Sequence, residues 1–236
     1  MNKINKDQID PVVEPESEKI HRMSRAIISA VPVLGGPLLE GLNALIEPPM
    51  ARRRTEWMTQ VTEAINDLVE SKGITIESLQ ENEKFFTVLV TASNIAIKNH
   101  LKEKLDALKN AVINSALPGA PDDVLQQIFL NLIDNCTTWH IAILKLYHGP
   151  VQWAQENGHI FPDWSMGGIP SVIESAYPEL NGQREVYNIV WQELNRYGLI
   201  NTDNIAITMT VSGMLSKRTT SIGDMFLEFI SSPKVP

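Results

Sequence analysis

The sequence has a single cysteine, no excess of positive charge and no long uninterrupted apolar run. Because Cys136 is the only cysteine, the chain cannot form an intramolecular disulfide, and we expect a protein of the reducing cytoplasm. Its 28 acidic residues outnumber its 20 lysines and arginines, which gives a formal net charge of −8. That balance argues against nucleic acid as a partner, since nucleic-acid-binding proteins present a basic surface.

The sequence also lacks the motifs of common enzyme chemistry. It contains no GxGxxG loop, no phosphate-binding loop with its lysine and no HExxH motif. Cys136 and His140 could share a helix face, but no second Cys/His cluster completes the ligand set that zinc needs. His140, beside Trp139, is better interpreted as a packed core histidine. We therefore predict a non-enzymatic protein without catalytic residues, metal, cofactor or small-molecule substrate.

The spacing of apolar residues predicts helices through most of the chain. Residues 1–16 are polar and carry no apolar region behind their lysines, so they predict a disordered tail rather than a secretory signal. Residues 17–148 show helical spacing without strand-like alternation and predict a helical bundle. Helix breaks are expected at Pro48–Pro49 and at Pro118–Pro121, whereas 78–117 predicts one long helix or two nearly collinear ones.

Two further helices are expected in the middle of the chain. Thr138–Tyr147 is apolar on most sides, which places it near the centre of the fold. The helix before it should begin near Asp122 or Asp123, where the helix dipole favours acidic residues. Its predicted buried stripe consists of Val124, Leu125, Ile128, Phe129, Leu132 and Ile133.

The last third of the sequence changes character. Residues 149–168 predict an irregular connector that packs through Trp153, Phe161 and Trp164. Residues 169–236 then predict helix, helix, hairpin and helix, with hairpin strands over 205–210 and 215–219; this is the order of a winged-helix module. The expected fold class is mainly α: an N-terminal helical bundle with a C-terminal winged-helix-like module that carries a small β-hairpin.

A winged-helix module raises the hypothesis of DNA binding. Its second helix, Gln183–Tyr197, would enter the major groove, and Lys217 and Arg218 would contact DNA from the wing. The helix carries two arginines and two glutamates, however, so its formal charge is zero. In an acidic chain this favours a module that contacts protein.

The segment AVPVLGGPLLEGLNALIEPP, residues 30–49, is nearly uncharged. A spanning helix needs about 20 continuous apolar residues. Prolines and glycines divide this segment into arms of about ten residues, each about 15 Å long. A buried corner between two helices and an interfacial membrane hairpin over 26–46 are both consistent with this pattern. The candidate membrane or partner contacts are Val31, Val33, Leu34, Leu38, Arg52, Arg53 and Arg54.

The arginine triplet Arg52–Arg54 fits either interpretation. It could hold both ends of a hairpin on the cytoplasmic face of a membrane. It could equally form a solvated helix start that pairs with Glu47 or Glu56.

The layout of the chain resembles a known bacterial family. The order is VPVLGGPLLEGLNALIEPP, then RRRTEW, HLKEKLDALKNAV and FLNLID, and finally LNRYGLI and MTVSGMLSKRTTSIGDMFLEFI. This order is similar to that of the abortive-infection alpha proteins, which have a helical body and a C-terminal "GL(I/L) … T-x-x-G-x-x-F" pattern. Gly198-Leu199-Ile200 and Thr220–Phe226 match that pattern. The resemblance covers about residues 30–230 and implies a bacterial cytoplasmic protein tied to phage defence, without an established catalytic residue.

These observations predict a non-enzymatic bacterial interaction protein, with phage defence as the context that the resemblance implies. The expected contact is a protein partner or a second copy of the chain. The two alternatives are a membrane-acting effector that inserts residues 26–46 and a winged-helix DNA-binding regulator.

Overall fold

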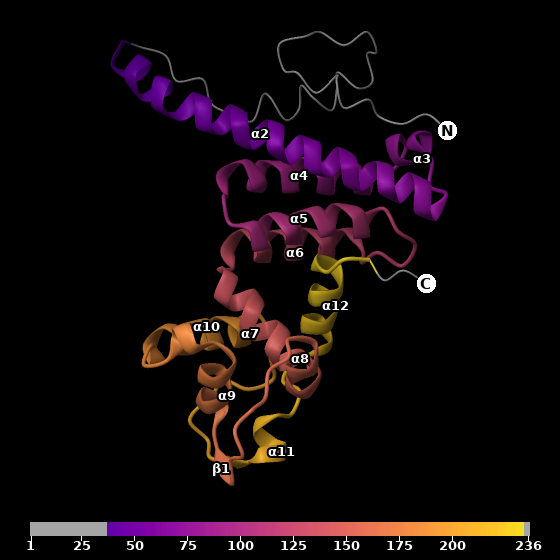
Figure 1. Cartoon of the computed structure of the whole chain (residues 1–236). Helices are drawn as coiled ribbons and strands as arrows, with labels where there is room; N and C mark the ends of the chain where they lie inside the picture. Colours follow the sequence, from indigo (N-terminus) through magenta and orange to yellow (C-terminus); the bar gives the residue numbers. More distant parts are fainter. Residues whose placement is uncertain (1–36, 234–236) are drawn as a thin grey trace. The chain divides into compact units, whose positions relative to one another are not determined.

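Residues 37–233 are described by a computed structural model, and within this range the chain is mainly α-helical (Figure 1). The described part also contains one small antiparallel sheet of two short strands. Both features confirm the predicted fold class of a mainly α protein with a small sheet. The described residues form two compact units. Unit 1 runs up to Asn135 and includes the residues from Phe229 onward, and unit 2 is Cys136–Glu228.

Unit 1 is a helical bundle in which the longest helix, α2, packs along α4 and α5, and α6 packs against the same two helices (Figure 1). Trp57 of α2 is buried, and its indole Nε1 donates a hydrogen bond to Ser93 Oγ of α4 at 2.9 Å. Phe129 of α6 and Phe229 lie 5.6 Å apart between ring centroids. The helices of unit 1 are α2 (Pro37–Lys72), α3 (Ile76–Gln80), α4 (Glu83–Lys98), α5 (Lys102–Ser115) and α6 (Asp123–Asn135).

Helix α2 runs unbroken through Pro48 and Pro49, so the break predicted at these prolines is wrong. The fixed φ of proline is compatible with a helix, and what proline removes is its own N–H donor. Both prolines are exposed.

The collinear arrangement predicted for 78–117 is also wrong. Helix α4 ends at Asn99, whose side-chain amide donates to Ile95 O at 2.8 Å and whose backbone N–H donates to Ala96 O at 3.0 Å. A three-residue link follows, and α5 returns antiparallel alongside α4 (Figure 1). The break at Pro118–Pro121, between α5 and α6, is confirmed.

The buried stripe of α6 differs in part from the predicted one. Phe129, Leu132 and Ile133 are buried as expected, but Val124 and Ile128 are 69% and 44% exposed. Gln126 and Leu130 are buried as well. The pattern of apolar residues could not identify Gln126, because this amide becomes compatible with burial only through its hydrogen bond to the carbonyl of Pro121, five residues earlier.

Unit 2 is built around α7, so this helix lies outside unit 1, although the predicted bundle 17–148 included it. Its burial is as its apolar composition predicted. Ile143, Leu144 and Tyr147 of α7 are fully buried. The Tyr147 hydroxyl donates to Ile169 O at 3.1 Å, and its ring meets that of Trp191 edge to face, 4.9 Å between centroids. The elements of unit 2 are α7 (Thr138–His148), α8 (Pro150–Glu156), β1 (Met166–Gly167), α9 (Ile169–Ala176), the 3₁₀ turn η2 (Pro178–Leu180), α10 (Arg184–Arg196), β2 (Met209–Thr210), α11 (Val211–Met214) and α12 (Ser221–Ile230), whose last two residues belong to unit 1.

The segment predicted as an irregular connector contains helix α8 and strand β1, so it is more regular than expected. Its aromatic residues pack as predicted, since all three are half-buried and lie in a series of ring contacts. The ring centroids are 4.8–5.7 Å apart along the series Trp139, Tyr177, Trp153, His159, Phe161 and Trp164.

The small sheet is confirmed, but its strands are not the ones predicted. Strand β2 pairs antiparallel with β1, in the register Gly167 with Met209, rather than with 215–219. Residues 211–214 form α11 instead of a hairpin turn, and only an isolated bridge joins Ile200 to Thr219.

Candidate functional site

The two basic residues predicted to contact DNA from a wing are engaged within unit 2. Lys217 Nζ lies 2.6 Å from Asp224 Oδ2. The Arg218 guanidinium is half-buried, and its Nη2 donates to Gly213 O at 2.8 Å and to Met209 Sδ at 3.1 Å. Both side chains therefore have partners within unit 2, and that of Lys217 is 47% exposed.

Asp224 is the centre of a polar cluster at the start of α12. Its Oδ1 accepts a hydrogen bond from Thr219 Oγ1 at 2.6 Å and lies 2.9 Å from His148 Nδ1. Partial burial acts to raise the pKa of Asp224, but the hydrogen bonds from Lys217, Thr219 and His148 outweigh it and hold this pKa below its ordinary value. Sequence reasoning missed this cluster because its members lie on separate elements.

A carboxylate that orients an imidazole is one part of an acid–base catalyst. In this cluster the Thr219 hydroxyl donates to Asp224 rather than to the imidazole. Among the described residues no hydroxyl or thiol hydrogen-bonds His148 Nε2. Within the same range, no group of three or more His, Cys, Asp or Glu side chains could hold a metal ion.

The two halves of the C-terminal sequence pattern meet in unit 2. Thr220 Oγ1 donates to Gly198 O at 2.6 Å, and the Thr220 N–H donates to Leu199 O at 3.0 Å. Gly198 has a φ of +71°, in the region that favours glycine. Gly223 packs directly on Leu199, since a Cβ there would lie 2.2 Å from Leu199 O. These pattern residues therefore hold the end of α10 against the start of α12 through hydrogen bonds and close packing.

His140 is 3% exposed and makes structural contacts, as the interpretation of a core histidine predicted. The Thr137 N–H donates to His140 Nδ1 at 3.1 Å, and His140 Nε2 lies 2.9 Å from Glu193 Oε2. Cys136 is buried. The arrangement fixes the imidazole between the start of α7 and the side of α10.

The outward face of α10 is the strongest candidate for a contact surface. Tyr187, Trp191 and Leu194 point into the core, whereas Ile189 is 57% exposed and Val186 is also exposed. Exposed Arg184 and Arg196 are balanced by Glu185 and Glu193, so the helix has no net charge. Beside it lies an open hollow of about 940 Å³, bounded by the first half of α10 and by residues 203–206. Sequence reasoning identified the helix but not its exposed apolar residues.

The predicted contacts in the N-terminal part of the chain are only partly described. Val31, Val33 and Leu34 lie outside the described residues, and Leu38 is described only as a backbone position of α2. Arg52 Nε lies 3.7 Å from Glu56 Oε1, and both side chains are exposed, so the expected pairing with Glu56 is present. The triplet lies inside α2, however, and not at a helix start, and Arg53 and Arg54 are half-buried. Of the described helices, none has the length and apolar character that crossing a bilayer requires.

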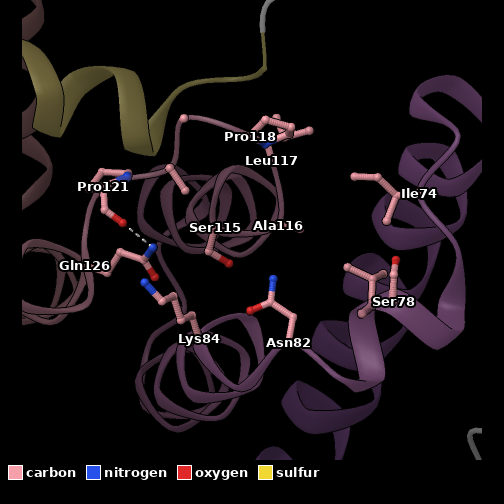
Figure 2. Close-up of a pocket in the computed structure, with 13 residues that line it drawn as sticks. Ile74, Ser78, Asn82, Lys84, Ser115, Ala116, Leu117, Pro118, Pro121 and Gln126 are labelled. Carbon is pink, nitrogen blue, oxygen red and sulfur yellow. Dashed lines mark hydrogen bonds between the residues drawn. The ribbon is translucent and has the colours of Figure 1, made fainter.

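A second, smaller hollow of about 420 Å³ lies in unit 1 (Figure 2). It is bounded by Ile74 and the second half of α3, the start of α4, the end of α5 with the loop 116–121, and Gln126 of α6. Lys84 stands at its rim with its Nζ 2.8 Å from Asp123 Oδ1, and the hydrogen bond and charge of Asp123 raise the pKa of Lys84. No sequence motif marks this hollow, because its lining comes from four separate segments.

Comparisons with protein-family models, with curated proteins and with solved structures find no match to this chain. The resemblance described from the sequence therefore stays a prediction.

Proposed function

We propose that this protein is a non-enzymatic interaction protein whose unit 2 contacts a protein partner through the outward face of α10. The observation that carries this proposal is the composition of that face, which combines exposed Val186 and Ile189 with balanced charges. Apolar residues with few net charges are typical of the centre of a protein interface.

The order α9, α10, β2 and α12 is compatible with the predicted winged-helix-like module, in which α10 would occupy the place of the recognition helix. The charge balance of α10 and the internal engagement of Lys217 and Arg218 support a protein partner over DNA. As the biological context we propose a bacterial cytoplasm and phage defence, on the strength of the sequence resemblance alone.

The test is a pull-down from bacterial lysate with membrane fractions retained, with and without phage challenge. Ile189→Glu places a charge in the centre of the face. Val151→Glu is the matched control, since Val151 is an exposed β-branched residue on α8 of the same unit. Identified proteins that bind the wild type and the control but not Ile189→Glu support the proposal. Equal recovery by Ile189→Glu rejects the α10 face, and turnover of nucleotide or nucleic acid by the purified protein rejects the non-enzymatic role.

A membrane-acting effector is the second candidate, and one observation favours it. Because α2 is continuous, the apolar residues 37–46 and the basic Arg52–Arg54 belong to one helix. Basic residues next to an apolar segment add electrostatic attraction to anionic membrane surfaces. Flotation with phosphatidylglycerol-containing vesicles tests this role. Recovery with the vesicles, reduced when Arg52–Arg54 are changed to glutamine, supports it, and absence from the vesicle fraction rejects it.

A further inference from the structure

Strand β2 has a partner strand on one side only, since the small sheet consists of β1 and β2. Residues 204–208, directly before β2, run without a turn or bend and so continue the strand backward. No backbone–backbone hydrogen bond joins 205–208 to any other residue that the structure describes. These residues therefore have the course of a strand, as their alternation predicted, without a second strand beside them.

The unpaired backbone groups of this segment lie on the side turned away from β1. A Cβ on Gly168 would lie 3.3 Å from Ile207 O and 3.5 Å from Ile205 O, so both carbonyls face Gly168, which follows β1 directly. In an extended chain the backbone groups of successive residues point alternately to the two sides. The N–H and C=O of Thr208 and the C=O of Ala206 therefore lie on the opposite side, the outer edge of β2.

This outer edge lacks the features that protect most edge strands from pairing with another chain. Such strands usually carry a lysine or a proline. Residues 204–216 contain no charged residue, and 204–210 also lack proline and glycine. Ala206 and Thr208 are exposed, and Ile207 is 49% exposed. An accessible, uncharged edge rich in isoleucine and threonine is a template for a further strand.

The free groups of the edge match those of a second copy of the same edge. With a two-fold axis at Thr208, two copies lie antiparallel, and each Thr208 N–H donates to the Thr208 C=O of the other copy. In the same register the Ala206 C=O accepts from the Thr210 N–H of the other copy. The Ala206 N–H keeps its own acceptor, since it donates to Asn204 Oδ1 at 2.8 Å.

Three properties favour a second copy as the occupant. The formal net charge of −8 makes two copies repel each other, and an uncharged edge adds no like charges at the contact. The register places Ile207 opposite Met209 of the other copy, in a pair whose side chains approach closely. Finally, a sheet of two short strands is marginal by itself, and pairing of the two edges gives four strands.

We propose that two copies of this protein associate through the outer edge of β2, residues 206–210, into one four-stranded antiparallel sheet. The strand order is β1 and β2, followed by β2 and β1 of the second copy. The proposal does not rest on the proposed function, because the α10 face consists of other residues, Val186 and Ile189. Either contact can fail without the other.

The test is sedimentation velocity of the full-length protein from micromolar to millimolar concentration, with amide hydrogen exchange measured by NMR at both ends of the range. We expect a monomer–dimer equilibrium in which the Thr208 N–H exchanges at least about tenfold more slowly in the dimer. Absence of a dimer at millimolar concentration would overturn the proposal and leave the edge to a strand of another protein. A dimer with unchanged exchange at Thr208 would overturn it as well.

Two variants at Thr208 test whether the backbone makes the contact. Thr208→Pro removes the outward N–H, which has no backbone partner within the described chain, and should weaken the dimer at least about tenfold. Thr208→Val keeps the N–H and the branched shape, so it is the matched control and should dimerise like the wild type. Unfolding temperatures measured alongside show that both variants are folded. Wild-type dimerisation of Thr208→Pro would reject the edge as the contact.

A charge at the two-fold axis provides a second test that keeps the backbone N–H. Thr208→Lys brings two like charges together at the axis and should weaken the dimer. Gln155→Lys adds the same charge at an exposed position of α8 and should not weaken it, since a lysine lowers the overall repulsion between two acidic chains. Equal dimerisation of the two lysine variants would contradict the proposal.

Discussion

Nδ1 of His148 lies 2.9 Å from Oδ1 of Asp224, which joins the end of α7 to the first turn of α12. The same carboxylate accepts hydrogen bonds from Thr219 and Lys217. Three donors on one carboxylate stabilise its charged form and hold the pKa of Asp224 low. The contact between His148 of α7 and Asp224 of α12 therefore depends on the ionisation state of Asp224.

We expect Asp224→Asn to destabilise the protein by about 1 kcal/mol at neutral pH, since the lost hydrogen bonds are charge-assisted but partly exposed. A lowered folded-state pKa means that Asp224 contributes stability above its unfolded pKa of about 4, and that this contribution is lost as the pH falls through the folded-state pKa. The difference in unfolding temperature between wild type and variant should thus be constant above about pH 5 and shrink in stronger acid. Asp203→Asn, at an exposed site, is the control; a difference independent of pH would contradict the assignment.

Gly223→Ala should be strongly destabilising. Its new Cβ would meet the backbone oxygen of Leu199, which cannot move aside as a flexible side chain could. We expect a loss of about 2–4 kcal/mol in the free energy of unfolding by urea. Ser221→Ala, at an exposed position of the same helix, should change stability by less than about 1 kcal/mol. Wild-type stability of Gly223→Ala would show that the close approach to Leu199 is not required.

The contacts of His140 predict a defined tautomer. Because the Thr137 N–H donates to Nδ1, the ring proton should lie on Nε2, where it faces Glu193. Long-range ¹H–¹⁵N spectra at pH 8 should report the Nε2–H form. The Nδ1–H form would be incompatible with this N-terminal cap of α7.

The internal engagement of Lys217 and Arg218 predicts that they make no wing contact with DNA. Fluorescence anisotropy with a labelled duplex at low salt should give no binding stronger than that of an acidic control protein. Lys217→Gln/Arg218→Gln should not alter the result. Salt-dependent binding that this double variant weakens would restore the DNA-binding hypothesis.

The helical class, the break at Pro118–Pro121 and the central position of α7 could all be predicted from the sequence. Each depends on a strong local signal: two prolines around a glycine, or apolar residues on most sides of a helix. The resemblance also directed attention to residues that do meet in space, since Thr220 and Gly223 contact the Gly198–Leu199 backbone.

The remaining features depend on side-chain hydrogen bonds and long-range pairing that the pattern of apolar residues does not encode. The turn after α4 rests on Asn99, a single polar residue in a helical pattern. Strand β2 pairs with β1, Met166–Gly167, and the helices α9 and α10 separate the two strands in the sequence. The hollow of unit 1 is lined from four segments, and its buried Gln126 looks like an ordinary surface residue until the carbonyl of Pro121 is placed beside it.

The composition of unit 1 has a consequence for the order of folding during synthesis. Phe229 is buried in unit 1, its ring meets that of Phe129, and the side-chain amide of Asn114 donates to the carbonyls of Phe229 and Ser231. Domains usually fold in the order in which the ribosome delivers them. The core of unit 1 lacks Phe229 until translation has passed through all of unit 2. The nascent helices α2 to α6 therefore keep an open apolar site for Phe229 until late in synthesis.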